Sequence, residues 1–145
     1  MRSITHFIHG SAASQDGGRA SDVLDPSTGA VQAQVHLGDA ALLDQAIESA
    51  KKAQPDWAAV NPQRRARVLF RYKELIEAHM DELAALLSSE HGKVIADAKG
   101  DVQRGLEVIE FACGVPHLMK GEYTEGAGPG IDVYSMRQAL GVVAG

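Results

Sequence analysis

The pattern of hydrophobic and polar positions begins with short β segments. Apolar and polar residues alternate from Val31 to His36, the period of two that is typical of a half-buried strand. Residues 5–10, "THFIHG", and residues 20–24, "ASDVL", predict further strands. In the intervening "DPSTG", Pro26 presets φ and Gly29 tolerates a left-handed conformation. The pattern therefore predicts a β-hairpin near the N-terminus.

A helical period replaces the alternation after residue 39. Asp39 is the expected N-cap of a helix over Ala40–Gln54, and Pro55 is expected to end it. Trp57 follows and is expected to fill a gap between helices. The apolar positions expected to face the core of this first helix are Leu43, Ala46, Ile47, Ala50 and Ala53.

Two more helical stretches follow. Asn61 and Pro62 provide a cap and a first helical residue, and a bend is expected near Asp81, before Gly92 ends the stretch. Its expected core-facing residues include Leu69, Ile76, Leu83 and Leu87. The last helix is predicted to begin at Val94 or Gly100 and to run to about Met119.

The C-terminal pattern returns to strands. A glycine-rich turn leads into an alternation that starts at Ile131 and predicts a strand. The short apolar run Leu140–Gly145 is typical of the start of a buried parallel strand, which needs a neighbouring strand. None remains in the sequence, so we expect the chain to stop in the middle of a fold.

Composition excludes several classes of function. The 145 residues are 45% hydrophobic and 23% charged, which is typical of a globular protein with its own core. We expect no membrane span and no secretory signal, because no apolar run has the required length. A single cysteine suits a reducing compartment, and we expect a cytoplasmic protein. A net charge of −5 without a basic stripe argues against nucleic acid as a partner.

Cys113 is the obvious candidate nucleophile, but its position favours packing. It continues a seam of Val102, Leu106 and Ile109 along one face of the last helix. The negative end of the helix dipole would also disfavour a thiolate there. No cysteine–histidine motif surrounds it, so we interpret Cys113 as a core residue.

Arg104 lies on the opposite side of the same helix, at the edge of a second apolar stripe with Val108 and Phe111. Spacing alone favours a local ion pair with Asp101 or Glu107. The alternative is a guanidinium that binds a substrate carboxylate through two parallel hydrogen bonds.

The sequence gives little indication of a metal site or a dinucleotide-binding loop. The six histidines show no metal-ligand spacing, and we expect no metal site. Gly126, Gly128 and Gly130 superficially suggest a dinucleotide loop, but no buried strand precedes them and no helix follows. We interpret them as a turn.

Longer stretches resemble a known family. "DPSTGAVQAQVHLGDAALLDQAIESAKKAQPDWA", "NPQRRARVLFRYKELIEAHMDELAALLSSEHGK" and "RQALGVVAG" resemble the N-terminal part of the NAD(P)-dependent aldehyde dehydrogenase superfamily. "GDVQRGLEVIEFACG" with "LMKGE" is similar to one branch, the CoA-acylating methylmalonate-semialdehyde dehydrogenases.

The resemblance implies an α/β aldehyde dehydrogenase fold. Residues 1–121 would be the leading hairpin and helices of the cofactor-binding domain, 122–139 an oligomerisation-arm hairpin, and 140–145 the start of the Rossmann-like core. The implied enzyme oxidises a methylmalonate or malonate semialdehyde through a thioacyl-enzyme, with NAD as cofactor and coenzyme A as co-substrate. It would be a homotetramer, and Arg104 would help to hold the substrate carboxylate.

Two departures from the family pattern matter. Ala139 stands where the family usually has proline. The catalytic cysteine, the oxyanion-hole asparagine and the NAD-binding loops have no counterpart here, so we expect no catalytic residue, no cofactor-binding residue and no activity of this chain alone. Two alternatives stay open: a non-catalytic structural or interaction module, and a hydrolytic dehydrogenase of the succinate-semialdehyde type.

Overall fold

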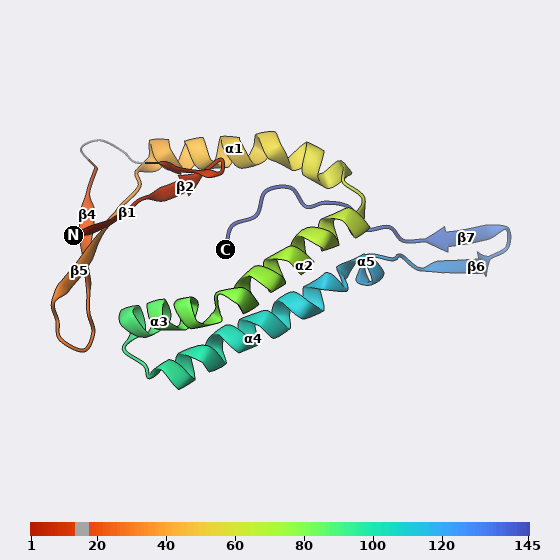
Figure 1. Cartoon of the computed structure of the whole chain (residues 1–145). Helices are drawn as coiled ribbons and strands as arrows, with labels where there is room; N and C mark the ends of the chain where they lie inside the picture. Colours follow the sequence, from red (N-terminus) through yellow and green to blue (C-terminus); the bar gives the residue numbers. More distant parts are fainter. Residues whose placement is uncertain (14–17) are drawn as a thin grey trace.

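The computed structural model describes residues 1–13 and 18–145. Figure 1 shows an open frame of strands and helices. The elements in chain order are β1 (Arg2–Ile4), β2 (His6–Ile8), β3 (Ser11–Ala13), β4 (Ala20–Leu24), β5 (Val31–His36), α1 (Ala40–Ala59), α2 (Pro62–Ala78), α3 (Met80–His91), α4 (Ile95–Cys113), α5 (Val115–Leu118), β6 (Tyr123–Gly128) and β7 (Ile131–Tyr134). Among these residues no helix is both long and apolar enough to cross a lipid bilayer.

The N-terminal strands form a small mixed sheet of order β1-β5-β4. β4 pairs antiparallel with β5, so the predicted hairpin is confirmed. In its turn, the Asp25 carboxylate accepts the backbone N–H of Ser27 at 2.8 Å, and Gly29 has a φ of +74°. β1 adds in parallel to the other side of β5, with Ile4 opposite Val35, and the sequence pattern did not predict this strand. β2 and β3 form a separate hairpin.

Both predicted N-caps are present, but the first helix is longer than expected. Asp39 Oδ1 accepts the Leu42 N–H at 2.9 Å, and Asn61 Oδ1 accepts the Gln63 N–H at 2.8 Å. The prediction that Pro55 ends α1 is wrong, because the helix runs to Ala59. A proline removes only one hydrogen bond, and the following residues continue to donate to earlier carbonyls. The helix ends where Val60 takes an extended conformation.

The later helices follow the prediction with one further correction. The bend near Asp81 is confirmed, since α2 ends at Ala78 and α3 begins at Met80. Gly92 ends α3 with a φ of +84°. The last helix is interrupted at Gly114 instead of running continuously to Met119. Pro116 has no N–H with which to continue the α4 ladder, so it falls in the first turn of a new short helix, α5.

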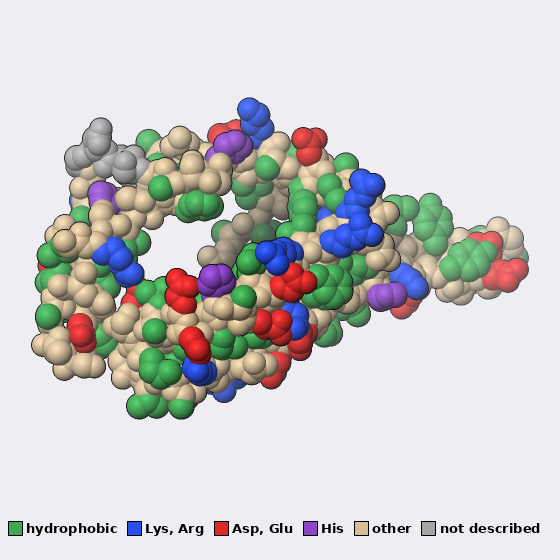
Figure 2. Space-filling view, viewed as in Figure 1, with side chains coloured by type: hydrophobic (Ala, Val, Ile, Leu, Met, Phe, Trp, Pro, Cys, Tyr) green, Lys and Arg blue, Asp and Glu red, His purple; other side chains and the backbone are tan. Residues whose placement is uncertain are grey.

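The core is small and consists mainly of alanines. α4 packs against both α2 and α3 (Figure 1). The described residues that are buried are Ala33, Ala66, Ala84, Ala98 and Leu106. The predicted core-facing residues of α2 and α3 are only half-buried. Figure 2 shows an opening through the frame, bounded by α1 on one side and the other helices on the opposite side. The chain therefore covers only part of its apolar surface.

Two features distinguish the C-terminal region. β6 and β7 form an antiparallel hairpin that projects away from the helices (Figure 1). Residues 135–145 then run back from the hairpin toward the helices without forming a strand. The expected strand over Leu140–Gly145 is therefore not formed, and Leu140 is 93% exposed. The physical reason is the lack of a neighbouring strand with which its backbone could pair.

Candidate functional site

Arg104 lies on the outer surface of α4, one helical turn after Asp101. Its side chain is 68% exposed. Nη2 donates to Asp101 Oδ1 in a short ion pair, so the local partner that the spacing favours is present. Among the residues that the structure describes, Arg104 has no second carboxylate partner. The rest of its guanidinium is available to an anion.

Asp101 is held from a second side by Lys93. Lys93 Nζ donates to Asp101 Oδ2 in another short contact, and its side chain is only 16% exposed. Lys93 also contacts Asp97 Oδ2 at 3.0 Å. The two oxygens of Asp101 therefore bind two different cations, one half-buried beneath the helix and one at its surface. We call Lys93, Asp97, Asp101 and Arg104 the α4 charge cluster.

The electrostatics of this cluster keep its members charged. The hydrogen bond from Lys93, followed by that from Arg104, lowers the pKa of Asp101 below its usual range. The carboxylates of Asp101 and Asp97 in turn raise the pKa of Lys93. Both shifts favour the charged forms of Lys93 and Asp101.

The turn that carries Lys93 is fixed by contacts from several elements. Gly92 takes the left-handed conformation, and Ser88 Oγ donates to the Lys93 carbonyl at 2.6 Å. Gln32 of β5 donates to the Ser89 carbonyl at 3.0 Å, and Arg2 of β1 pairs with Glu90 at 3.1 Å. The N-terminal sheet therefore anchors the end of α3, which sets the position of Lys93.

Sequence reasoning considered the pair of Arg104 with Asp101 but missed the contribution of Lys93. The missed signal is a spacing of four residues from Lys93 to Asp97 and of four more to Asp101. On a helix this spacing places the carboxylates on one face, directly after the lysine.

Cys113 lies at the end of α4 and is half-buried, on the seam that contains the buried Leu106. Val108 and Phe111, the second stripe beside Arg104, are exposed. The helix thus has one face packed against α2 and α3 and a second apolar face without cover among the described residues. Within those residues no group of three His, Cys, Asp or Glu side chains could hold a metal ion.

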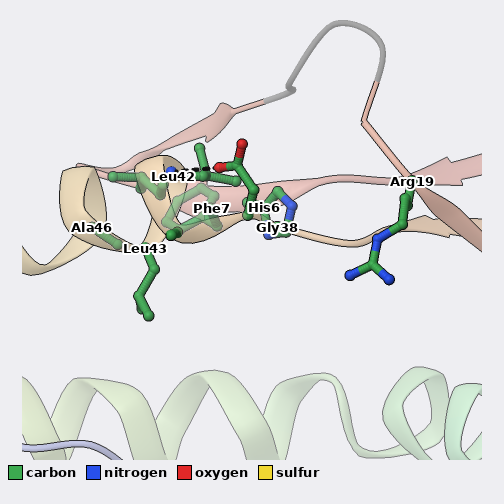
Figure 3. Close-up of a pocket in the computed structure, with 10 residues that line it drawn as sticks. His6, Phe7, Arg19, Gly38, Leu42, Leu43 and Ala46 are labelled. Carbon is green, nitrogen blue, oxygen red and sulfur yellow. Dashed lines mark hydrogen bonds between the residues drawn. The ribbon is translucent and has the colours of Figure 1, made fainter.

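A separate pocket lies between β2 and the first turns of α1. Its volume is about 790 Å³. Figure 3 shows Phe7 beside the first turns of α1 and His6 beside Gly38, with Leu43 pointing away from both and Arg19 at some distance. His6 Nε2 is buried there without a hydrogen-bond partner in the described part of the chain. Arg104 does not line this cavity, so the two features are separate.

The glycines at positions 126, 128 and 130 do not form a dinucleotide loop. They lie in an antiparallel hairpin, whereas such a loop joins a strand to a helix. The interpretation as a turn is confirmed for Gly130 only, because Gly126 and Gly128 lie within β6. Gly126 has a φ of +65°, and its N–H donates to Asp132 Oδ1 at 2.9 Å. These three glycines therefore do not provide a phosphate-binding loop for NAD.

Comparisons with known proteins identify the family. The model of the aldehyde dehydrogenase family matches residues 12–145. Malonate-semialdehyde dehydrogenase from Pseudomonas aeruginosa is 43% identical over the whole chain, which spans 29% of the length of that protein.

Solved structures agree in fold. A protein from Sinorhizobium meliloti, assigned as a methylmalonate-semialdehyde dehydrogenase and complexed with NAD, has a TM-score of 0.92 and 57% identity, over 97% of this chain and 29% of that one. Methylmalonate-semialdehyde dehydrogenase from Oceanimonas doudoroffii has a TM-score of 0.90 and 44% identity, over 95% of this chain and 28% of that one. The α/β fold is thus the N-terminal part of the aldehyde dehydrogenase fold, and this chain belongs to the aldehyde dehydrogenase family.

Proposed function

We propose that these residues are the N-terminal part of an NAD-dependent dehydrogenase that acts on malonate or methylmalonate semialdehyde and transfers the acyl group to coenzyme A. The observation that carries the proposal is the similarity of nearly the whole chain to semialdehyde dehydrogenases, at 43% identity to one relative and 57% to another. The bound NAD of the second protein supports NAD as the cofactor.

Arg104 is the residue to which we assign recognition of the substrate carboxylate. Both semialdehydes carry a carboxylate, and a guanidinium binds such a group through parallel N–H···O bonds. Arg104 has only one carboxylate partner among the described residues, so it retains donors for a second. The exposed Val108 and Phe111 lie on the same helix, where further protein would enclose a substrate site beside them.

The catalytic thiol, the oxyanion donors and the NAD and coenzyme A sites belong, in this proposal, to residues outside this chain. A thioacyl mechanism needs an activated thiolate and donors directed at the developing oxyanion. Cys113 is half-buried in a packed seam and is not assigned to this role. We further propose a cytoplasmic homotetramer in which residues 122–139 form part of the oligomerisation arm.

The substitution Arg104→Leu in the full-length enzyme tests the assignment. Loss of a charge-assisted contact should lower kcat/KM for malonate semialdehyde by at least about tenfold, and change kcat/KM for propanal by less than about threefold. Arg71→Leu is a matched control, because Arg71 is similarly exposed and pairs with Glu74 at the same i,i+3 spacing. Equal losses for both aldehydes in Arg104→Leu would contradict a carboxylate-binding role.

The isolated chain of residues 1–145 should produce no NADH from malonate semialdehyde. Formation of NADH, followed by absorbance, would show that the chemistry resides in these residues. The intact mass of the native protein distinguishes the enzyme from a non-catalytic interaction module: a mass near 15.4 kDa would favour the module.

Acyl transfer to coenzyme A is tested separately. The full-length enzyme should form acetyl-CoA from malonate semialdehyde when coenzyme A is present. If the rate and the product are the same without coenzyme A, the enzyme is a hydrolytic dehydrogenase, as in the succinate-semialdehyde alternative.

A further inference from the structure

We infer that Asp101 is a positioning residue that sets the substrate selectivity of the enzyme by fixing the guanidinium of Arg104, while Lys93 anchors Asp101 from below. This inference rests on the proposed carboxylate-binding role of Arg104. Asp101 is itself negatively charged and repels a carboxylate. A positioning role therefore predicts that removing Asp101 weakens substrate binding, whereas its charge alone predicts the opposite.

The geometry of the α4 charge cluster supports the inference. Asp101 divides its two carboxylate oxygens between Lys93 Nζ and Arg104 Nη2. Lys93 is mostly buried, Asp101 is 32% exposed and Arg104 is largely exposed, so the three form a chain from the helix interface to the surface. Arginine has many rotamers, and holding it in one of them is entropically costly for an unsupported side chain. An anchored acceptor at Oδ1 removes much of that freedom before a ligand arrives.

The guanidinium of Arg104 also lies close to Gly100 on the same helix. A Cβ built at Gly100 would lie at van der Waals distance, 4.0 Å, from Arg104 Nη1. Nη2 is occupied by Asp101. Asp101 therefore orients one edge of a guanidinium whose side chain is otherwise 68% exposed.

Electrostatics alone predicts the opposite effect of removing Asp101. Without this carboxylate the cluster would gain one positive charge, and an incoming anion would be attracted more strongly. A positioning role predicts weaker binding instead, because Arg104 would lose its preferred geometry. The sign of the change in KM for a carboxylated substrate therefore separates the two interpretations.

The experiment compares Asp101→Ala with Asp97→Ala in the full-length enzyme. Alanine favours the helix, and Asp97 remains as a counter-charge for Lys93 in the first variant. We expect Asp101→Ala to raise KM for malonate semialdehyde about threefold to tenfold, with kcat and the KM for propanal nearly unchanged. Asp97→Ala removes the other carboxylate partner of Lys93 but does not touch Arg104, and should leave both KM values unchanged.

A double variant and an isosteric variant complete the test. In the Arg104→Leu background, Asp101→Ala should have no further effect on KM, since the group that it positions is gone. Asp101→Asn keeps one acceptor oxygen, enough for only one of the two cations, and should fall between the wild type and Asp101→Ala, which covers the case in which alanine impairs folding. A lower KM in Asp101→Ala, or equal changes for both aldehydes, would overturn the inference. If Arg104→Leu lowers kcat/KM equally for malonate semialdehyde and for propanal, the proposed carboxylate-binding role of Arg104 fails instead.

Discussion

At the scale of single residues, Gly92 combines a left-handed conformation with a close neighbouring side chain. Its φ is +84°, and a Cβ there would lie 3.0 Å from Pro26 Cγ in the β4–β5 turn. Gly92→Ala should therefore destabilise the protein by about 1–2 kcal/mol, because the left-handed region and the close contact both oppose a side chain. The shift in the urea midpoint of unfolding measures this effect.

Gly105 provides the matched control. It lies inside α4, has no positive φ, and a Cβ there would meet no atom within 4 Å in the described structure. Gly105→Ala should raise stability by up to about 1 kcal/mol, through the better helix propensity of alanine. If this variant destabilised the full-length protein, another part of that protein would have to pack against α4 at this point.

Within the candidate site, only the contacts between residues about one helical turn apart could be predicted. Asp101 and Arg104 are three residues apart, so their pairing could be predicted from the helical period. The contact of Lys93 with Asp101 also depends on the direction of the chain after Gly92, where the Ser88 hydroxyl donates to the Lys93 carbonyl. The spacing from Lys93 to Asp97 and Asp101 was a signal for the contact, but it does not contain the direction of that turn.

At the scale of elements, the β6–β7 hairpin depends on one carboxylate. Asp132 accepts the Gly126 N–H at 2.9 Å and the Tyr123 hydroxyl at 2.7 Å, and these bonds lower its pKa, the backbone bond contributing most. Because the pKa of Asp132 is lowered in the folded state, its carboxylate stabilises the hairpin fully above the pKa of the unfolded chain, near 3.9. This stabilisation is lost as the pH falls through the pKa of the folded state.

We therefore expect the hairpin to loosen below about pH 4. Hydrogen exchange at the Gly126 amide, referenced to the intrinsic rate at each pH, should show a falling protection factor. In Asp132→Asn the protection should be lower at neutral pH and should no longer change between pH 5 and pH 3. A wild-type protection factor that is constant over this range would contradict the role of the carboxylate.

The element boundaries were predictable where a cap or a breaker acts alone. Asp39 and Asn61 begin helices as expected, because each satisfies a backbone donor within its own turn. Pro55 and Pro116 were more difficult to interpret, since a proline can stop, continue or restart a helix according to its neighbours. The short strand β1 has no alternation of its own and forms through pairing with β5, whose residues lie 31 positions further along the chain than their partners in β1.

At the scale of the whole molecule, the surface is larger than that of a compact protein. The accessible area is 10903 Å², whereas a folded monomer of 15.4 kDa is expected to expose about 7200 Å². Much of the excess lies on apolar side chains, including Leu43 on α1 and Val108 and Phe111 on α4. Exposed apolar area on this scale marks a surface that is covered in the functional state.

The isolated 145 residues should accordingly bind a hydrophobic dye such as ANS and be cleaved rapidly by trypsin, while the full-length enzyme should do neither to a comparable extent. Dye fluorescence at equal molar concentration measures the difference. If the isolated chain showed neither dye binding nor rapid cleavage, these residues would have to form a self-sufficient domain by covering their own apolar faces.

The alanines between the helices have a consequence for natural variation. Ala84 on α3 and Ala98 on α4 are completely buried, and these two helices pack directly against each other. A single added methyl group at such a position has no void to occupy and would push the helix axes apart. In a library of all single replacements, the smallest side chains of this protein should therefore be among the least replaceable.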